Sequence, residues 1–133
     1  MITLEIVTPD RQVLSTDVEE VVLPSVDGSM GVLPGHAPLL CQLDVGEMSY
    51  RQDGTRRYMA ISGGFAEVLR EKVSILARTS EPAEDIDLAR AKRAHENAEK
   101  ELKVKGSDAA FRAAEVSLKR ALNRIRVHSR HGI

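Results

Sequence analysis

The hydrophobic pattern of the chain changes near residue 80, and this change divides the sequence into two parts. Before it, apolar residues alternate with polar ones or form short runs rich in β-branched residues, which is typical of strands. After Thr79-Ser80-Glu81-Pro82 the apolar residues recur every three or four positions, which is typical of amphipathic helices. The 133 residues therefore predict an α+β protein, with a β-rich part at 1–80 and a helical part at 81–133.

Short strands separated by turn residues fill the first part. The pattern predicts strands at 2–7, 18–23, 38–43, 47–51, 57–61, 65–69 and 73–77. Turn sequences stand between them, among them Asp53-Gly54, which suits a tight hairpin, and Gly63-Gly64. Because no helix of crossover length interrupts the strands, we expect an antiparallel β-sandwich or flattened barrel rather than a parallel sheet.

The second part predicts an antiparallel two-helix hairpin. Asp85 is expected to cap a helix that ends near Lys103, and Gly106 to break it. Ser107 or Asp108 would cap a second helix that ends near residue 127. A linker this short between amphipathic helices implies that they run antiparallel.

The helix faces that should meet are rich in alanine. They comprise Ala91, Ala94, Ala98 and Leu102 on the first helix, and Phe111, Ala114, Leu118, Ala121, Leu122 and Ile125 on the second. Burying a methyl group gains about 0.8 kcal/mol, against about 1.5–3 kcal/mol for a whole Leu or Phe side chain. Such shallow surfaces predict modest cohesion, which suits a hairpin with two arrangements. A hairpin packed permanently on the β-rich part is the alternative.

The sequence contains no recognisable catalytic or metal-binding pattern. Its glycine-rich segments lack the spacing and the Lys-Ser/Thr pair of a phosphate-binding loop. No histidine has a His partner four positions away, and Cys41 is the single cysteine. No apolar run approaches the roughly 20 residues of a membrane span, and the N-terminus does not resemble a signal peptide. We therefore expect a binding or coupling protein without catalytic residues or bound metal.

A net charge of −1 conceals an asymmetry along the chain. Residues 112–133 carry six basic residues against Glu115 alone. A basic end favours an acidic partner, although solvated helix faces are the ordinary explanation for such charges. A nucleic-acid-binding protein that uses this helix is the alternative function, but the near-zero net charge and the lack of a recognisable module weigh against it. A small nucleotide-dependent enzyme is a further alternative, which the missing phosphate loop disfavours.

Five segments in order along the chain resemble the epsilon subunits of bacterial F-type ATP synthases. They are Val7-Thr8-Pro9-Asp10, Gly31-Val32-Leu33-Pro34-Gly35-His36-Ala37-Pro38-Leu39, Ile61-Ser62-Gly63-Gly64-Phe65-Ala66-Glu67-Val68, Glu84-Asp85-Ile86-Asp87 with Arg90-Ala91, and Leu118-Lys119-Arg120-Ala121-Leu122-Asn123-Arg124. The Leu-Pro-Gly-His and Ser-Gly-Gly-Phe segments are highly specific together, and the resemblance covers essentially the whole chain. The order of strands followed by a hairpin agrees with it.

The resemblance implies a role in the central stalk of a rotary motor. Family members have a β-sandwich of about ten strands that lies against the gamma subunit and the rotor ring of c subunits. Their C-terminal helices either fold against the sandwich or extend along gamma toward the catalytic α/β hexamer, where they inhibit ATP hydrolysis. The resemblance thus implies a non-catalytic subunit with no required cofactor. It would lie on the cytoplasmic face of the bacterial plasma membrane and meet the membrane only through the complex.

The resemblance also implies two sets of contact residues. Ser29, Met30 and His36 would meet the rotor ring, with Ser29 at a place where family members often carry an acidic residue. The basic residues expected to face acidic segments of the hexamer are Arg120, Arg124, Arg126 and Arg130. Charges at the rim of an interface tune encounter and specificity more than affinity.

Some bacterial members bind ATP as a regulatory ligand in the folded hairpin. The residues that match their motif are Glu81, Ile86, Asp87, Arg90, Ala91, Arg120 and Arg124. Carboxylates can accept hydrogen bonds from the adenine amino group or the ribose, while arginines hold phosphates. Asn97 stands where strong binders carry arginine. The loss of one charge-assisted hydrogen bond, about 1.5–3 kcal/mol, would weaken binding roughly ten- to a hundredfold.

Overall fold

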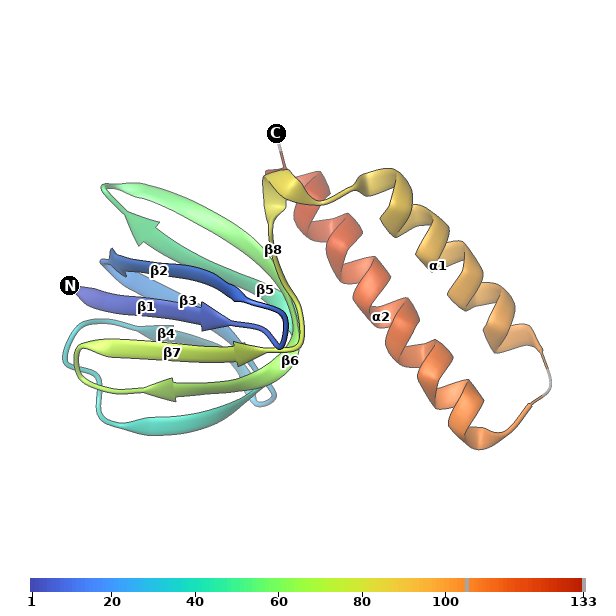
Figure 1. Ribbon diagram of the computed structural model, residues 1–133, viewed down its shortest axis with the longest axis horizontal. Helices are drawn as coiled ribbons and strands as arrows, with labels where there is room; N and C mark the ends of the chain where they lie inside the picture. Colours follow the sequence, from blue (N-terminus) through green and yellow to red (C-terminus); the bar gives the residue numbers. More distant parts are fainter. Residues whose placement is uncertain (105, 133) are drawn as a thin grey trace. The chain divides into compact units, whose positions relative to one another are not determined.

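The computed structural model describes residues 1–104 and 106–132, and the chain divides into two compact units, Met1–Pro82 and Ala83–Ile133. The first unit is built of strands and the second of helices (Figure 1). This architecture of a β-sandwich followed by two helices confirms the predicted fold class. No helix among the described residues is long and apolar enough to cross a membrane.

Residues 1–82 form one sheet of eight strands that folds into a sandwich. The strands are β1 (Ile2–Val7), β2 (Gln12–Val18), β3 (Glu20–Ser25), β4 (Gly28–Val32), β5 (Leu39–Gln52), β6 (Thr55–Val68), β7 (Lys72–Ala77) and β8 (Ser80–Pro82). Their order is β2-β1-β7-β6-β5-β3-β4, with β8 paired to β6. The prediction of an antiparallel sandwich needs one correction, because β1 and β7 pair in parallel.

Two long strands account for the difference between these eight strands and the expected ten. β5 and β6 each run for 14 residues, where the sequence predicted two shorter strands. Asp53 and Gly54, both with positive φ, form the predicted hairpin turn between them. Gly63 and Gly64 lie inside β6 instead of ending a strand. Their positive φ angles mark the point where the edge of β6 passes from β8 to β7.

The hydrophobic core lies inside the sandwich and is almost entirely aliphatic. Strand β1 shows how alternation fills it, because Ile2, Leu4 and Ile6 are fully buried and the residues between them are only half-buried. Fully burying such a side chain contributes about 1.5–3 kcal/mol. The inward residues of β1, β3, β5, β6 and β7 therefore make up most of the core of this unit.

The tip of the β5–β6 hairpin is fastened to the β2–β3 corner by polar contacts. Arg51 Nε donates to Glu19 Oε2 over 3.0 Å, and the Gly54 backbone N–H donates to Glu19 Oε1 over 3.2 Å. The Gly54 bond first, and then Arg51, lower the pKa of the Glu19 carboxyl below its ordinary value of 4.5. The side chain of Gln52 donates to Thr16 Oγ1 over 2.7 Å. These bonds hold the hairpin tip in register with its neighbours.

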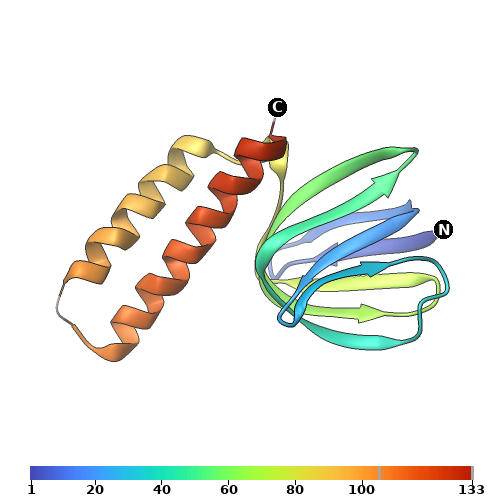
Figure 2. The same ribbon diagram turned by 180° about the vertical axis from the view of Figure 1, so that it is seen from behind.

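The second unit consists of a 3₁₀ turn η1 (Ala83–Asp85) and the helices α1 (Leu88–Lys103) and α2 (Asp108–His131). Asp87 caps α1, not Asp85 as predicted, because its carboxylate accepts the Arg90 N–H over 3.0 Å while Asp85 belongs to η1. Ser107 caps α2, as one of the two predicted candidates. The helices run antiparallel, as Figure 1 and Figure 2 show.

Small side chains are buried between the helices at two-turn spacing. Ala91 and Ala98 on α1 and Ala114 and Ala121 on α2 are all at most 3% exposed. This confirms the alanine-rich faces, because small residues let two helices approach closely. Phe111 was predicted on the same face but is 49% exposed, since it lies in the first turn of α2 near the tip of the hairpin.

Candidate interaction surfaces

A row of outward side chains crosses four strands of the sandwich. The strand registers align Val7 of β1 with Leu76, Leu76 with Phe65, and Phe65 with Gln42 of β5. Residues aligned in this way share one face of a sheet. Phe65 is 51% exposed and Leu76 is 60% exposed, which is unusual for large apolar side chains on adjacent strands. This outer row is therefore a candidate docking surface.

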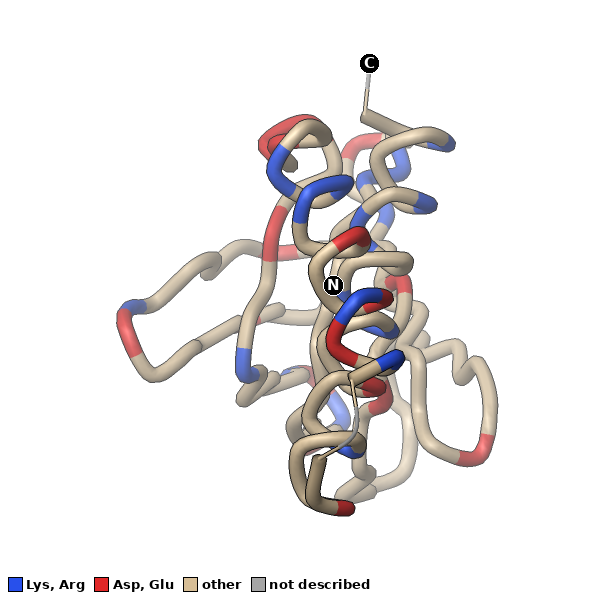
Figure 3. The backbone as a smooth tube through the Cα atoms, turned by 90° about the vertical axis from the view of Figure 1, so that its right-hand side faces the viewer, with Lys and Arg blue, Asp and Glu red and all other residues tan. Residues whose placement is uncertain are grey.

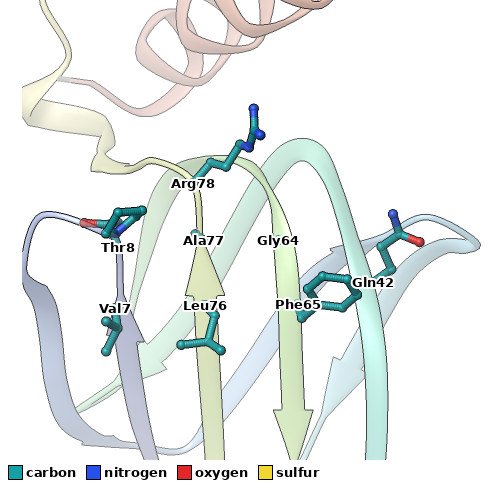
Figure 4. Close-up of a pocket in the computed structure, with 9 residues that line it drawn as sticks. Val7, Thr8, Gln42, Gly64, Phe65, Leu76, Ala77 and Arg78 are labelled. Atoms are coloured by element: carbon teal, nitrogen blue, oxygen red, sulfur yellow. The ribbon is translucent and has the colours of Figure 1, made fainter.

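A pocket of about 470 Å³ lies along the outer row (Figure 4). Thr8 and Pro9 of the β1–β2 turn line it together with the row, and Arg78 stands at its rim. Gly64 forms part of its floor with φ +129°, and a Cβ there would lie 2.0 Å from the carbonyl oxygen of Leu76. Only glycine lets the backbones of β6 and β7 approach this closely, so the shape of the pocket depends on a glycine at position 64.

The residues predicted to meet the rotor ring lie on β4 and on the connection that follows it. Ser29 is exposed and Met30 packs partly against the core, so Met30 also has a structural role. His36 is half-buried, and its Nδ1 donates to the Ala37 carbonyl oxygen over 2.7 Å. The backbone N–H of Gly35 donates to Arg70 O over 2.7 Å, which fixes the connection to the β6–β7 turn. His36 is thus held with its Nε2 atom as the ring position that a partner can use.

A second pocket, of about 450 Å³, lies between the β3–β4 turn and the start of β5. Ser29 and Met30 line it, and so does Cys41. Burial raises the pKa of the Cys41 thiol above its ordinary value of 9.0, so the thiol is protonated at neutral pH. Leu39 and Leu40, at 40% and 69% exposure, extend its apolar lining.

The structure brings part of the predicted ATP-binding set together at the start of α1. Asp87 and Arg90 are joined by the capping hydrogen bond, and both are exposed. Ile86 and Ala91 are buried, so they pack the unit as well as match the motif. Glu81 lies in β8 and so belongs to the other unit.

The four arginines predicted to face the catalytic hexamer all lie in the second half of α2. Figure 3 marks Lys and Arg positions in blue, and several lie near the C-terminal end of the chain. Arg120 and Arg124 are half-buried, whereas Arg126 and Arg130 are exposed. Residues four apart share a helix face, so they form two pairs. The six residues from Arg120 to Arg126 turn the helix by about 600°, which places the two pairs on different faces. The structure therefore does not gather all four on one surface.

Sequence reasoning missed the outer row as a unit, although it singled out the Ser-Gly-Gly-Phe segment. One signal was present in β7, where Ile75, Leu76 and Ala77 are consecutive apolar residues. In a strand neighbouring side chains face opposite sides, so one of three must point outward. That Leu76 lies beside Phe65 follows only from the strand register.

Two family models together cover almost the whole chain. The beta-sandwich domain of the ATP synthase Delta/Epsilon chain matches residues 1–83, and the long alpha-helix domain of the same chain matches residues 84–129. The ATP synthase epsilon chain of Geotalea daltonii is 44% identical over 130 residues, which are 97% of this chain and 94% of the relative. That of Syntrophobacter fumaroxidans is 48% identical over 126 residues, with coverage of 95% and 94%.

Solved structures show the same fold. A chain in the Euglena gracilis mitochondrial ATP synthase, in a structure of OSCP, F1 and the c-ring, matches with a TM-score of 0.82 and 27% identity, covering 98% of this chain and 81% of that one. A chain in the central stalk and c-ring structure of the Tetrahymena thermophila mitochondrial ATP synthase matches with a TM-score of 0.66 at 13% identity and 96% coverage of both chains, which shows the fold alone. By sequence over both of its units, this chain belongs to the delta/epsilon family of ATP synthases, among the epsilon chains.

Proposed function

We propose that this chain is a regulatory subunit of the central stalk of a bacterial F-type ATP synthase. Its sandwich would bind the gamma subunit and the ring of c subunits, and its helices would restrain ATP hydrolysis by the α/β hexamer. The observation that carries the proposal is the alanine-lined hairpin, which forms a compact unit of its own. The family assignment gives no support to the alternative of a nucleic-acid-binding protein.

In this role the chain contributes no catalytic group and works as an accessory subunit of the complex. We place it at the cytoplasmic face of the plasma membrane, bound peripherally through its partners. Rotation would be transmitted through the sandwich, which is the unit with the larger aliphatic core.

The outer row is our proposed docking surface for gamma. Phe65 and Leu76 expose large apolar groups around a pocket, and aromatic residues that fill or flank pockets dominate many interfaces. Phe65→Ala should weaken binding of gamma roughly ten- to a hundredfold, because 1.5–3 kcal/mol of apolar burial is lost. Leu33→Ala is the matched control, since Leu33 is 55% exposed but lies outside the row. Equal gamma affinities of the two variants, measured by calorimetry, would contradict this assignment.

Ser29 and His36 are our proposed polar contacts to the rotor ring. The Ala37 carbonyl holds the Nδ1 hydrogen of His36, so Nε2 is left to accept a hydrogen bond from the ring. His36→Ala should reduce binding to isolated c rings and leave gamma binding unchanged. The two affinities can be compared in pull-downs with c rings and with gamma. If the His36→Ala variant retains as much c ring as the wild type does, His36 acts only within its own loop.

The inhibitory role can be tested by removing the helices. A chain truncated after Ala83 retains the first unit and should still bind gamma. ATP hydrolysis by the reconstituted complex should then rise, because the element that restrains it is absent. Hydrolysis at the rate of the complex with the full chain would exclude an inhibitory role for this protein.

We propose ATP as a regulatory ligand of the hairpin, bound within that unit by Ile86, Asp87, Arg90, Ala91, Arg120 and Arg124. Asp87 is a poor test position, since its loss would also remove the cap of α1 at a cost of about 1 kcal/mol. Arg90→Ala should abolish the calorimetric signal of ATP, while Lys92→Ala, which removes an exposed cation two positions further on another face of α1, should keep it. Asn97→Arg should tighten binding roughly ten- to a hundredfold. Equal heats from the Arg90 and Lys92 variants would show that Asp87 and Arg90 form only a helix cap.

A further inference from the structure

A hydrogen bond joins the end of α2 to the segment that precedes α1. His128 Nδ1 lies 3.2 Å from the carbonyl oxygen of Ala83 in η1, and η1 packs against α2. The two residues are 45 positions apart in sequence. The bond therefore closes the hairpin at the end opposite its turn, and both partners belong to the same compact unit.

The chemistry of the acceptor fixes the state of the imidazole. A carbonyl oxygen can only accept, so Nδ1 of His128 must carry the hydrogen. In the neutral ring Nε2 is then an acceptor, and this tautomer is an observable consequence of the contact. The same oxygen also receives the Ile86 N–H at a longer 3.4 Å, so His128 makes the shorter of these two bonds.

The C-terminal cap of α2 leaves just enough room for this ring. A Cβ at Gly132 would lie 2.3 Å from His128 Nδ1, which is far inside contact distance. The Gly132 N–H donates to His128 O over 2.7 Å and ends the helix there. A Cβ there would also lie 2.6 Å from the His128 carbonyl oxygen, so a side chain at this position would disturb the helix cap as well as the ring.

We propose that His128 is a latch residue that holds the end of α2 on the hinge segment 83–87. Ala83 is 1% exposed, so when the ring leaves, its carbonyl oxygen keeps the longer bond from the Ile86 N–H but is shielded from water. The end of α2 cannot leave η1 unless this bond breaks. The latch sets what fraction of the free chain has an opened hairpin. That this fraction affects ATP hydrolysis rests on the proposed function.

Two variants separate the donor from the shape of the ring. His128→Phe keeps the ring and replaces Nδ1 by carbon, whereas His128→Asn keeps an N–H donor at the same place without the ring. In the full-length chain the Phe variant should show amide hydrogen exchange in the last turns of α2 about two- to tenfold faster, because one net hydrogen bond is lost. Exchange in the Asn variant should stay near the wild-type rate. Gly132→Ala should speed exchange at least as much, since its Cβ would crowd both the ring and the His128 carbonyl oxygen.

Nitrogen chemical shifts of the His128 ring give a second measurement, which a change in the stability of the helix alone would not alter. They should report hydrogen on Nδ1 in the wild type and a shift toward Nε2 in Gly132→Ala. Hydrogen on Nε2 in the wild type, or equal exchange in all variants, would overturn the latch.

Hydrolysis by the reconstituted ATP synthase distinguishes the latch from the proposed function. Faster exchange together with altered inhibition in His128→Phe supports both. Faster exchange with unaltered inhibition supports the latch and contradicts the regulatory role of the hairpin.

Discussion

The alanine seam makes a sharp prediction about the helical unit. Ala121 is 0% exposed on α2, so Ala121→Leu would add three carbon atoms where the helices leave no room. Overpacking of this kind costs about 1–3 kcal/mol. The equilibrium between closed and open hairpin should shift toward the open form roughly five- to 150-fold. Ala113→Leu is the control, because Ala113 is exposed on the same helix and leucine is nearly as good a helix former as alanine.

Circular dichroism can follow this unit separately from the sandwich. The helices comprise 16 and 24 residues of the second unit, while the first unit consists of strands, so ellipticity at 222 nm reports the hairpin. Urea unfolding followed at this wavelength should show a lower midpoint for Ala121→Leu and an unchanged one for Ala113→Leu. Equal midpoints would refute the inference that the seam needs small side chains.

Three further predictions concern single contacts. Because the pKa of Glu19 is lowered, its carboxylate stabilises the sandwich above pH 4.5, and this contribution is lost as the pH falls through the lowered pKa. In Glu19→Gln the free energy of unfolding, followed by tyrosine fluorescence, should therefore decrease less between neutral and acidic pH than in the wild type. Gly64→Ala should destabilise the sandwich by at least about 2 kcal/mol through positive φ and contact with backbone, while Gly31→Ala, with open space around it, should change little in thermal unfolding. Asp87→Ala should destabilise the hairpin by about 1 kcal/mol, and Asp87→Ser should restore most of it, as measured by helix ellipticity.

Local signals in the sequence predicted the local features of the fold. Asp53-Gly54 forms a turn because both residues accept positive φ, and the helices follow their apolar period. Three strands, β2, β4 and the three-residue β8, were missed because their sequences lack clear alternation. β2 is an edge strand with mostly exposed or half-buried residues, and β4 contains two glycines in five residues. Tertiary pairing, rather than propensity, makes them strands.

Features that combine distant parts of the chain could not be predicted without knowing the strand registers. Gly63-Gly64 reads as a turn, but β7 and β8 pair along both sides of this point and keep the chain extended as one strand. The motif of Asp87 and Arg90 could be found from the sequence because residues three positions apart at a helix N-terminus always lie close together. The outer row could not, since its four members come from four separate strands.

The two units differ in the kind of side chain that holds them together, and this difference bears on regulation. The sandwich buries long aliphatic groups such as Ile2, Leu4 and Ile75, each worth about 1.5–3 kcal/mol. The seam of the hairpin buries methyl groups worth about 0.8 kcal/mol each, and the hydrogen bond of His128 reinforces it. A partner can shift an equilibrium only by its differential affinity for the two states. A partner that binds the opened helices a few kcal/mol more tightly could therefore open the hairpin while the sandwich stays folded on the stalk.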